Sequence, residues 1–381
     1  YWKIINKLCK EISQELNIYF IFITATQPLI FGKNEIKELA SKSDYYFKQC
    51  KRTKLINLPY EMEKEEFFSF VDKIIDEKKD KNILIIVNTI KLSQELFKYI
   101  NENKDKNDDR KLVYLSTSVI PKSRLERIEN IKNKESKNIV VSTQMVEAGV
   151  DIDMDIGYKD ISKLDSEEQF LGRIARSGIK NGIPGIVYFF NFDQAEKIYR
   201  DDYRMEKSLT LGNEEMRTVL KEKRFQTYYE QVMHYLKEMK NRKTSEEGLE
   251  YFFSESLKKL DFLKIQKRME LIEEDCWHVD IILCRKLVME DGTEKDGRKI
   301  WEHYKELLSD YQMDYSEKKV KLSECQSDLN LFRYQIKRNI QIPYNEMIGE
   351  LYCVYDGEQY FQDEKIDREK LEGDHMYFID L

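Results

Sequence analysis

Two arginines three residues apart are the strongest chemical signal in the sequence. Arg173 and Arg176 follow Gly172 in the stretch Gln169-Phe-Leu-Gly172-Arg173-Ile-Ala-Arg176. The spacing places both guanidinium groups on one helical turn, where both can reach a single phosphate. A guanidinium pairs with phosphate oxygens through two parallel hydrogen bonds and does not lose its charge. The stretch therefore predicts a phosphate-binding site, the alternative being a surface pair that forms ion pairs.

A second polar stretch follows a strand rich in β-branched residues. Ser142, Thr143 and Gln144 can hydrogen-bond a nucleic-acid backbone, because they lie where a parallel strand ends. Gly149 permits close approach of a ligand, and Asp151 can accept a hydrogen bond from a ribose hydroxyl. The alternative is a solvated sheet edge.

Three alternating aspartates in the same stretch raise the possibility of a metal site. We reject a calcium-binding loop, because Ile156 stands where the sharp turn needs Gly and Ser162 where the bidentate Glu belongs. The six cysteines lack C-x-x-C spacing, and the four histidines are far apart in sequence. No metal site is predicted.

Three shorter polar groups each follow an apolar run. Thr24-Ala-Thr26 could relay hydrogen bonds between two sites or could cap a strand end. Asn88 and Thr89 follow a second run, and Ser116 follows a third. Each is a weak signal alone, and their order along the chain gives them weight.

The elements that position these residues alternate between strands and helices. Apolar runs predict strands at 18–24, 54–58, 83–88, 112–115, 138–142, 155–158 and 185–190. Helical spacing predicts helices at 91–101 and 121–132, with Pro121 in the first turn. The alternation predicts an α/β fold with a buried parallel sheet and flanking helices.

After Phe192 the character of the sequence changes. Long charged helices are predicted at 214–241 and 246–269, followed by strands at 277–283 and 351–355, a turn at 290–297 and a helix at 300–308. This pattern predicts a mostly helical mixed α+β C-terminal domain.

Bulk composition sets limits on the partners. The net charge is −7, so binding of nucleic acid would depend on local Lys and Arg placement. The cysteine pattern favours a reducing, cytoplasmic location, and no apolar run is long enough for a membrane helix. Because the chain starts at Tyr1, we expect a fragment.

The motifs in this order resemble the later motifs of superfamily 2 helicases, most closely the CRISPR-associated helicase-nuclease of type I interference systems. The resemblance covers roughly residues 15–192 and implies a RecA-like fold. It departs from the family at Phe170, where Arg is frequent, and at Ala175, where Asn is frequent. The phrase Val146-Glu-Ala-Gly-Val-Asp-Ile-Asp-Met-Asp155 favours the CRISPR family over other superfamily members.

The resemblance implies roles for individual residues. It implies catalytic roles at the ATP cleft for Arg173, Arg176 and Gln169, and coupling of hydrolysis to movement for Thr24 and Thr26. It also implies ATP binding by Gly149, Asp151 and Gly172, and nucleic-acid binding by Asn88, Thr89, Ser116, Ser142, Thr143 and Gln144.

Three domains follow from the resemblance. Residues 1–45 would be the tail of a first motor lobe, 46–192 the second lobe, and 193–381 an accessory domain. The sequence contains neither a G-x-x-x-x-G-K-[ST] loop nor an Asp-Glu-x-His motif. ATP and Mg²⁺ are implied as cofactors, with the Mg²⁺ ligands in the missing first lobe, and we expect this fragment alone to be inactive.

The predicted function is the C-terminal part of an ATP-dependent single-stranded DNA translocase that unwinds foreign DNA in CRISPR interference. The predicted partners are single-stranded DNA and a CRISPR surveillance complex, without a membrane. The alternatives are another RNA or DNA helicase or a restriction-type motor of this superfamily, a non-catalytic nucleic-acid-binding scaffold, and an unrelated α/β nucleotide-binding regulator.

Overall fold

The chain forms two compact units. The structure is a computed structural model that describes residues 2–24, 26, 28–32, 34–40, 45–46, 51–117, 119–133, 137–179, 182–192, 195–199, 202–242, 255–269, 278–289, 291–337, 343–362 and 365–366. Unit 1 comprises Tyr1–Tyr114 and Glu135–Glu273, and unit 2 comprises Leu115–Lys134 and Glu274–Leu381. The domain limits expected at residues 45 and 192 stay predictions.

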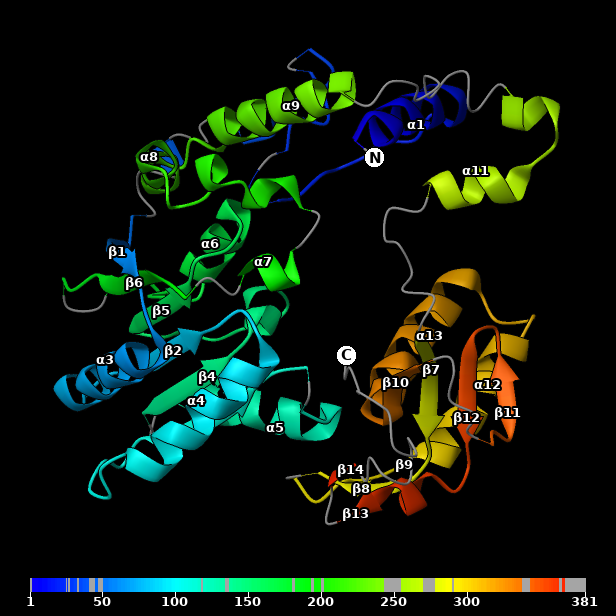
Figure 1. Cartoon of the computed structure of the whole chain (residues 1–381). Coiled ribbons are helices and arrows are strands. Elements are labelled where there is room, and N and C mark those ends of the chain that lie inside the picture. Colours follow the sequence, from blue (N-terminus) through cyan, green and yellow to red (C-terminus); the bar gives the residue numbers. More distant parts are fainter. Residues whose placement is uncertain are drawn as a thin grey trace. The chain divides into compact units, whose positions relative to one another are not determined.

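A six-stranded parallel sheet in the order β1-β6-β5-β2-β4-β3 carries the predicted α/β fold (Figure 1). In the centre, Ile85 of β2 lies opposite Val141 of β4 on one side and Tyr158 of β5 on the other. These strands match the predicted ones within a few residues. Their bounds are β1 Thr53–Glu61, β2 Ile83–Ile86, β3 Lys111–Leu115, β4 Asn138–Ser142, β5 Ile156–Asp160 and β6 Gly185–Asn191.

Helices α3 (Lys64–Glu77) and α4 (Ile90–Asn103) cover one face of this sheet. Phe67 of α3 and Leu96 of α4 are fully buried against the strand residues Ile85 and Ile139. The apolar residues of α4 recur at helical spacing, and the Thr89 side chain caps its first turn by accepting a hydrogen bond from Leu92 N. The predicted helix at 91–101 is therefore confirmed.

The opposite face packs against α6 (Leu164–Leu171) and the turn that follows it. A Cβ at Gly157 of β5 would lie 2.6 Å from Phe170 Cζ and 2.7 Å from Ile174 Cδ1. Gly157 thus lets α6 come close to the sheet, and the arginine stretch starts from a tightly packed helix.

Two predictions for unit 1 are wrong. The predicted strand 18–24 pairs with no strand among the described residues, and its side chains are exposed, Ile23 to 93%. A strand needs a neighbouring backbone to hydrogen-bond, and the six-stranded sheet does not include this segment.

The single helix predicted at 214–241 is instead two helices, α8 (Glu214–Glu222) and α9 (Phe225–Arg242). Lys223 breaks it with φ +61°, a left-handed residue that ends a helix. Part of the helix predicted at 246–269 lies outside the described residues. Further elements of unit 1 whose bounds the described residues define are α1 Trp2–Leu16, α7 Ala195–Ile198, α11 Phe262–Met269, and the 3₁₀ helices η1 Gln144–Glu147, η2 Tyr203–Met205 and η3 Lys207–Leu209.

Unit 2 has a mixed four-stranded sheet in the order β10-β7-β12-β11. Strand β7 (His278–Leu283) runs parallel to β12 (Leu351–Val354) and antiparallel to β10 (Arg333–Lys337). The strands predicted near 277–283 and 351–355 are confirmed, as is a mixed region after the parallel sheet. The other strands are β8 Lys286–Val288, β9 Glu294–Asp296, β11 Glu346–Ile348, β13 Phe361–Gln362 and β14 Lys365–Ile366.

Two helices pack on one another beside this sheet, α12 (Gly297–Ser309) and α13 (Tyr315–Leu329). Trp301 of α12 is fully buried, and its Nε1 donates a hydrogen bond to Glu346 Oε2 at 2.7 Å. Unit 2 also contains α5 (Pro121–Lys132), which begins at Pro121 as predicted, with η4 Asn330–Phe332 and η5 Gly357–Tyr360. None of the described helices is long and apolar enough to cross a membrane.

Candidate nucleotide and nucleic-acid site

The segment 143–153, between β4 and β5, links several of the predicted site residues. Thr143 precedes η1, and Gly149 has φ +73°. A Cβ at Gly149 would meet no atom within 4 Å among the described residues. Gly149 is therefore required by its left-handed backbone and not by close packing within the chain.

Gln144 connects this segment to β2. Its Nε2 donates to Asn88 Oδ1 at 2.8 Å and to Asn88 O at 3.2 Å. Asn88 is 2% exposed, and its own Nδ2 donates to Ile161 O at 3.0 Å. The predicted residues Asn88 and Gln144 thus meet, and Asn88 ties together the ends of two strands.

Arg173 holds the same segment from the other side. Its Nε donates to Val146 O at 2.8 Å and its Nη2 to Glu147 O at 2.6 Å. Burial and the neighbouring Arg176 lower the pKa of Arg173. In this arrangement Arg173 binds the backbone of the segment, and it does not point its guanidinium freely to solvent.

Arg176 is exposed and forms an ion pair. Its Nε lies 2.9 Å from Asp151 Oδ1, and the Asp151 side chain is 70% exposed. Asp153 receives the backbone amides of Arg176 at 2.7 Å and Ser177 at 3.3 Å. The two aspartates therefore bind different parts of the arginine turn. The carboxylate of Asp151 pairs with the Arg176 side chain, whereas the carboxylate of Asp153 accepts hydrogen bonds from backbone amides.

The other two residues of the arginine stretch lie on α6. Gln169 is exposed, and Gly172 ends the helix. A Cβ at Gly172 would lie 3.0 Å from Gln169 O, so this turn is tighter than a larger residue usually permits. Ala175 has φ +47°, a left-handed conformation that Asn adopts more readily than Ala.

The hydroxyl groups predicted to bind nucleic acid are mostly buried. Ser116 and Ser142 are fully buried, and Thr143 is 5% exposed. Ser142 Oγ donates to Thr143 O at 3.0 Å, and Thr89 caps α4. Their role in binding nucleic acid stays a prediction, and in this structure Ser142 bonds the backbone at the end of β4 while Thr89 stabilises the start of α4.

Thr24 is hydrogen-bonded to Thr26, and Thr26 contacts a tyrosine of α9. Thr24 Oγ1 donates to Thr26 O at 2.6 Å, and Thr26 Oγ1 lies 2.9 Å from Tyr229 Oη of α9. Thr26 and Tyr229 are both buried. Thr26 thereby links this segment to α9.

The sequence analysis missed a buried charged cluster between β5, η1 and α6. Lys159 of β5 is fully buried, and its Nζ lies 2.9 Å from Glu147 Oε1 and 3.5 Å from Glu167 Oε2. Ser162 Oγ accepts a further hydrogen bond from Lys159 Nζ at 2.9 Å, and Ser166 Oγ donates to Glu147. We call these five residues the Lys159 cluster. A lysine inside a buried parallel strand was the available signal, because such a charge needs a partner.

Burial and opposite charges act against each other in this cluster. Burial alone would lower the pKa of Lys159, but Glu147 and Glu167 raise it above its ordinary value. Burial raises the pKa of Glu167 to about 7, and Lys159 opposes that rise. The neighbouring Asp160 also has its pKa raised to about 7 by burial.

The residues present fit part of a nucleotide site. The exposed Arg176 can exchange the carboxylate of Asp151 for a phosphate oxygen, because both are anionic acceptors of the same geometry. Among the described residues, no three His, Cys, Asp or Glu side chains are grouped as metal ligands. Arg176 is therefore able to pair with a phosphate group, and binding of ATP at this place stays a prediction.

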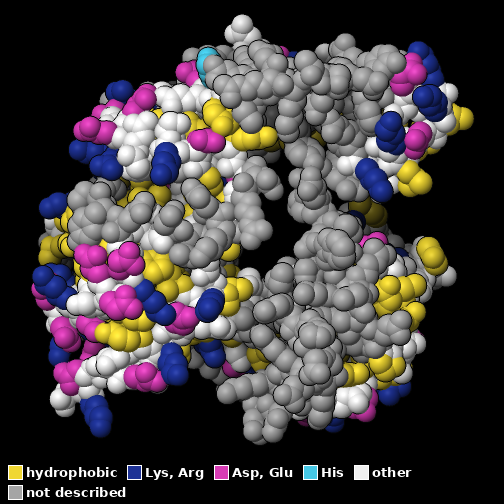
Figure 2. All heavy atoms as spheres, viewed as in Figure 1, with side chains coloured by type: hydrophobic (Ala, Val, Ile, Leu, Met, Phe, Trp, Pro, Cys, Tyr) yellow, Lys and Arg dark blue, Asp and Glu magenta, His cyan; other side chains and the backbone are white. Residues whose placement is uncertain are grey.

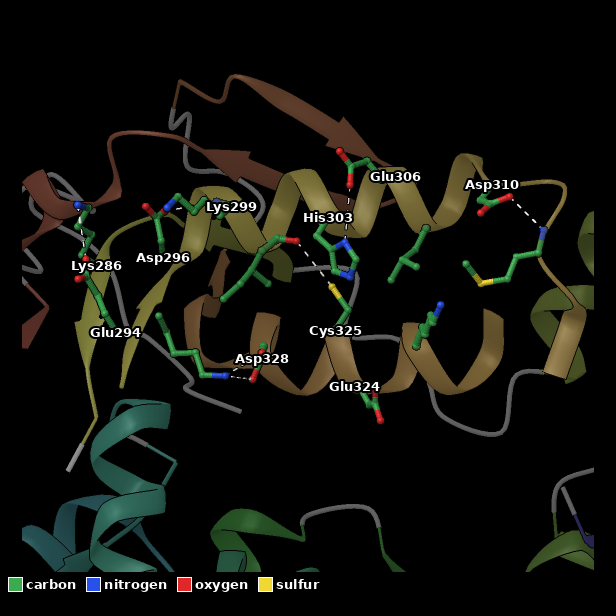
Figure 3. Close-up of a pocket in the computed structure, with 15 residues that line it drawn as sticks. Lys286, Glu294, Asp296, Lys299, His303, Glu306, Asp310, Glu324, Cys325 and Asp328 are labelled. Carbon is green, nitrogen blue, oxygen red and sulfur yellow. Dashed lines mark hydrogen bonds and ion pairs between the residues drawn. The ribbon is translucent and has the colours of Figure 1, made fainter. Parts of the chain in front are cut away.

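A separate cavity of about 940 Å³ lies in unit 2 and contains none of the predicted site residues. Figure 3 shows its walls, formed by α12, α13 and the β8–β9 hairpin. Lys295 Nζ lies 2.9 Å from Asp328 Oδ2, and His303 Nδ1 lies 3.7 Å from Glu306 Oε2. Several charged side chains of these walls are thus paired with one another.

Charges on the visible face of unit 1 are mixed. Figure 2 shows Lys and Arg side chains interspersed with Asp and Glu side chains, without a broad area of one sign on that face. This agrees with the net charge of −7.

Comparisons with known proteins agree with the motifs. Residues 79–179 match the family model described as CRISPR-associated nuclease/helicase Cas3, C-terminal. A protein of Methanothermobacter thermautotrophicus described as CRISPR-associated nuclease/helicase Cas3 is 27% identical over 63% of this chain and 28% of its own length. A protein of Streptococcus thermophilus with the same description is 27% identical over 38% of this chain and 17% of its own length.

The crystal structure of T. fusca Cas3 is 14% identical, covers 80% of this chain and 39% of that chain, and gives a TM-score of 0.44. The chain spans less than a third of the length of the curated relatives it matches. The resemblance inferred from the motifs is confirmed in this form: residues 79–179, which include strands β2 to β5 of the parallel sheet and the arginine stretch, match the C-terminal family model of the CRISPR-associated nuclease/helicase Cas3.

Proposed function

We propose that unit 1 works as the second lobe of an ATP-driven motor that moves along single-stranded DNA in CRISPR interference. The observation that carries the proposal is the set of hydrogen bonds around the segment 143–153. Gln144 in this segment binds Asn88, Val146 and Glu147 bind Arg173, and Asp151 binds Arg176. One short segment therefore contacts both the predicted DNA side and the arginine turn.

Each end of the segment has a distinct task in this proposal. At the Gln144 end, amide and backbone groups at the carboxyl ends of β2 and β4 bind the phosphates and sugars of the strand. At the other end, Arg176 leaves Asp151 and pairs with a phosphate of the nucleotide. Arg173 keeps the segment and the arginine turn together while Arg176 changes its partner.

ATP with Mg²⁺ would supply the free energy for movement by phosphoryl transfer. We propose that the phosphate-binding loop and the Mg²⁺ ligands come from another lobe of the same protein, since the chain's sequence has no G-x-x-x-x-G-K-[ST] loop. A surveillance complex that recruits the motor, and a cytoplasmic location, complete the proposal. Buried free thiols at Cys284, Cys325 and Cys353 suit a reducing compartment.

Titration of a fluorescent oligodeoxythymidine at several salt concentrations tests the DNA part. We expect log affinity to fall with log salt by about 0.7 for each phosphate that the chain neutralises. Gln144→Ala should weaken binding about tenfold, because it removes an amide and loosens Asn88. Gln226→Ala is the matched control, since Gln226 is exposed on α9 and donates a hydrogen bond to Glu230 one turn further along the same helix. Affinity that is independent of salt, or equal losses in both variants, would contradict the proposal.

A further inference from the structure

The Lys159 cluster includes Glu147, which lies between the two ends of the segment 143–153. Four of its five members come from three elements: Lys159 from β5, Glu147 from η1, and Ser166 and Glu167 from α6. The fifth, Ser162, lies in the turn between β5 and α6. The side chains of Lys159 and Glu167 are fully buried, and that of Glu147 is 6% exposed. Solvent therefore does not compensate these charges, and each depends on the others.

Glu147 is held twice, by two different parts of the molecule. Its carboxylate binds Lys159 and Ser166, while its backbone carbonyl accepts a hydrogen bond from Arg173 at 2.6 Å. A shift of η1 must therefore either move the arginine turn with it or break the hydrogen bond to Arg173 or the buried bonds of the Glu147 carboxylate.

Glu167 anchors the opposite side of the cluster. Its Oε1 accepts the Ser162 amide at 2.6 Å, and its Oε2 lies 3.5 Å from Lys159 Nζ. Because Glu167 is only two residues before Gln169 on α6, the start of the arginine stretch is fixed to the end of β5. One ammonium thus binds carboxylates from two elements that are far apart in sequence.

A buried ion cluster is an unusual way to stabilise this position. Apolar side chains of similar size in such a place are often at least as stabilising, whereas removing one charged member leaves its partners unpaired. What a charged cluster adds is directional: its hydrogen bonds permit one relative placement of η1 and α6, where an apolar contact permits sliding.

We propose that Lys159 is a positioning residue that couples the DNA end of the segment 143–153 to the arginine turn, so that occupancy of one end is felt at the other. This inference rests on the proposed function for the identity of the two ends. The coupling itself is a property of the folded chain, and it can be measured without ATP.

Hydrogen exchange read by mass spectrometry on the whole chain tests the coupling. In the ligand-free chain, Lys159→Met should accelerate exchange at least tenfold both at 144–148, within the segment, and at 172–178, where the amides of Ala175 and Arg176 are hydrogen-bonded. The control is Ile156→Val, a purely apolar change on the same strand. The two variants are compared at temperatures equally far below their thermal unfolding midpoints, so that a difference in global stability does not account for a difference in exchange. Exchange at both sites no faster than in this control would overturn the proposal.

A second variant covers the case in which Lys159→Met does not fold. The triple change Lys159→Met, Glu147→Gln and Glu167→Gln removes all three charges together and leaves no unpaired ion. It should show the same loss of protection at both sites, and protection equal to that of Ile156→Val would again count against the coupling.

Addition of a single-stranded oligodeoxythymidine separates this inference from the function on which it rests. In the wild type and in Ile156→Val, DNA should slow exchange at 144–148 and also at 172–178. In the triple variant DNA should slow exchange at 144–148 only, and slowing at both places would refute the coupling. If DNA protects neither place in the wild type, the proposed DNA binding fails, while the ligand-free comparison still decides on the Lys159 cluster.

Discussion

Arg176 Nε lies 2.9 Å from Asp151 Oδ1 on the exposed edge of unit 1. The arginine predicted to reach a phosphate therefore already carries an anionic partner, and Asp151 was itself predicted to contact the nucleotide. Exposed ion pairs of this kind contribute only about 0–1 kcal/mol, so a phosphate can replace the carboxylate at little cost. Arg173, three residues earlier, binds backbone carbonyls instead. The two arginines of one motif thus have separate structural roles.

Replacing Arg176 should affect hydrolysis and leave the fold intact. In a protein that also contains the phosphate-binding loop, we expect Arg176→Ala to lower DNA-stimulated ATP hydrolysis by about 10³–10⁵-fold, the usual effect of such an arginine. Arg224→Ala is the control, because Arg224 is also exposed and pairs with a carboxylate, Glu222. The chain alone should hydrolyse ATP negligibly. Equal rates in the two variants would remove Arg176 from the reaction.

The two aspartates beside the arginine turn should differ in their effect on stability. Asp153→Ala removes the acceptor of two backbone amides and should lower the free energy of unfolding by about 1–3 kcal/mol. Asp151→Ala breaks only an exposed ion pair and should lower it by less than about 1 kcal/mol. Urea unfolding followed by circular dichroism gives both values. A larger loss for Asp151→Ala would show that the ion pair, and not the backbone hydrogen bonds, holds the turn.

Stability should fall as the pH rises from about 5 to about 7. The pKa values of Asp160 and Glu167 are raised to about 7 by burial, above those of the unfolded chain. Between the unfolded and folded values the folded state binds more protons, so its stability decreases with pH by up to about 1.4 kcal/mol per pH unit for each group. Above pH 7 this contribution is flat.

Asp160→Asn isolates one of these groups. The amide oxygen can still accept the Phe192 amide, which Asp160 Oδ1 accepts at 2.9 Å, but the side chain no longer titrates. Urea midpoints measured from pH 5 to 8 should therefore fall less steeply in Asp160→Asn than in the wild type. Parallel curves would mean that Asp160 has an ordinary pKa.

A methyl group on Gly157 should disturb the packing of α6. The added Cβ would lie 2.6 Å from Phe170 Cζ, so Gly157→Ala should lower the free energy of unfolding by about 1–3 kcal/mol. A second change, Phe170→Leu, makes room at the point of contact and should recover part of this loss when combined with it. Thermal unfolding of both single variants and the double variant gives the coupling between the two sites. Strict additivity would show that the helix can move away without loss.

The parallel sheet could be predicted because its strands are short, mainly apolar runs between helical patterns. In β2 all four residues, Ile83–Ile86, are buried, and such runs have few other uses. The break at Lys223 could not be predicted, since neither Gly nor Pro marks it. Residues 18–24 are predicted as a strand from their apolar composition alone. Composition does not show whether another strand lies beside them to form hydrogen bonds.

The sequence predicts which residues form the candidate site, but it does not predict which atoms they contact. Motif order brought out Gln144, Arg173 and Arg176, whose neighbours in space come from distant parts of the sequence. The carbonyl partners of Arg173 could not be foreseen, because every residue has a carbonyl and only the fold selects two of them. Lys159 was overlooked because its partners, Glu147 and Glu167, lie on other elements and share no spacing with it.

The exposed segment 18–23 sets a limit on how the chain can be handled. Its residues, Ile-Tyr-Phe-Ile-Phe-Ile, carry no charge and no proline, and Tyr19, Ile21 and Ile23 are 72–93% exposed. Uncharged stretches of six residues with strong β propensity are templates for strands of other copies to stack upon. Aggregation through this segment, and not unfolding of the core, should therefore limit the concentration at which the isolated chain stays in solution. Ile21→Lys or Ile23→Lys should raise that concentration.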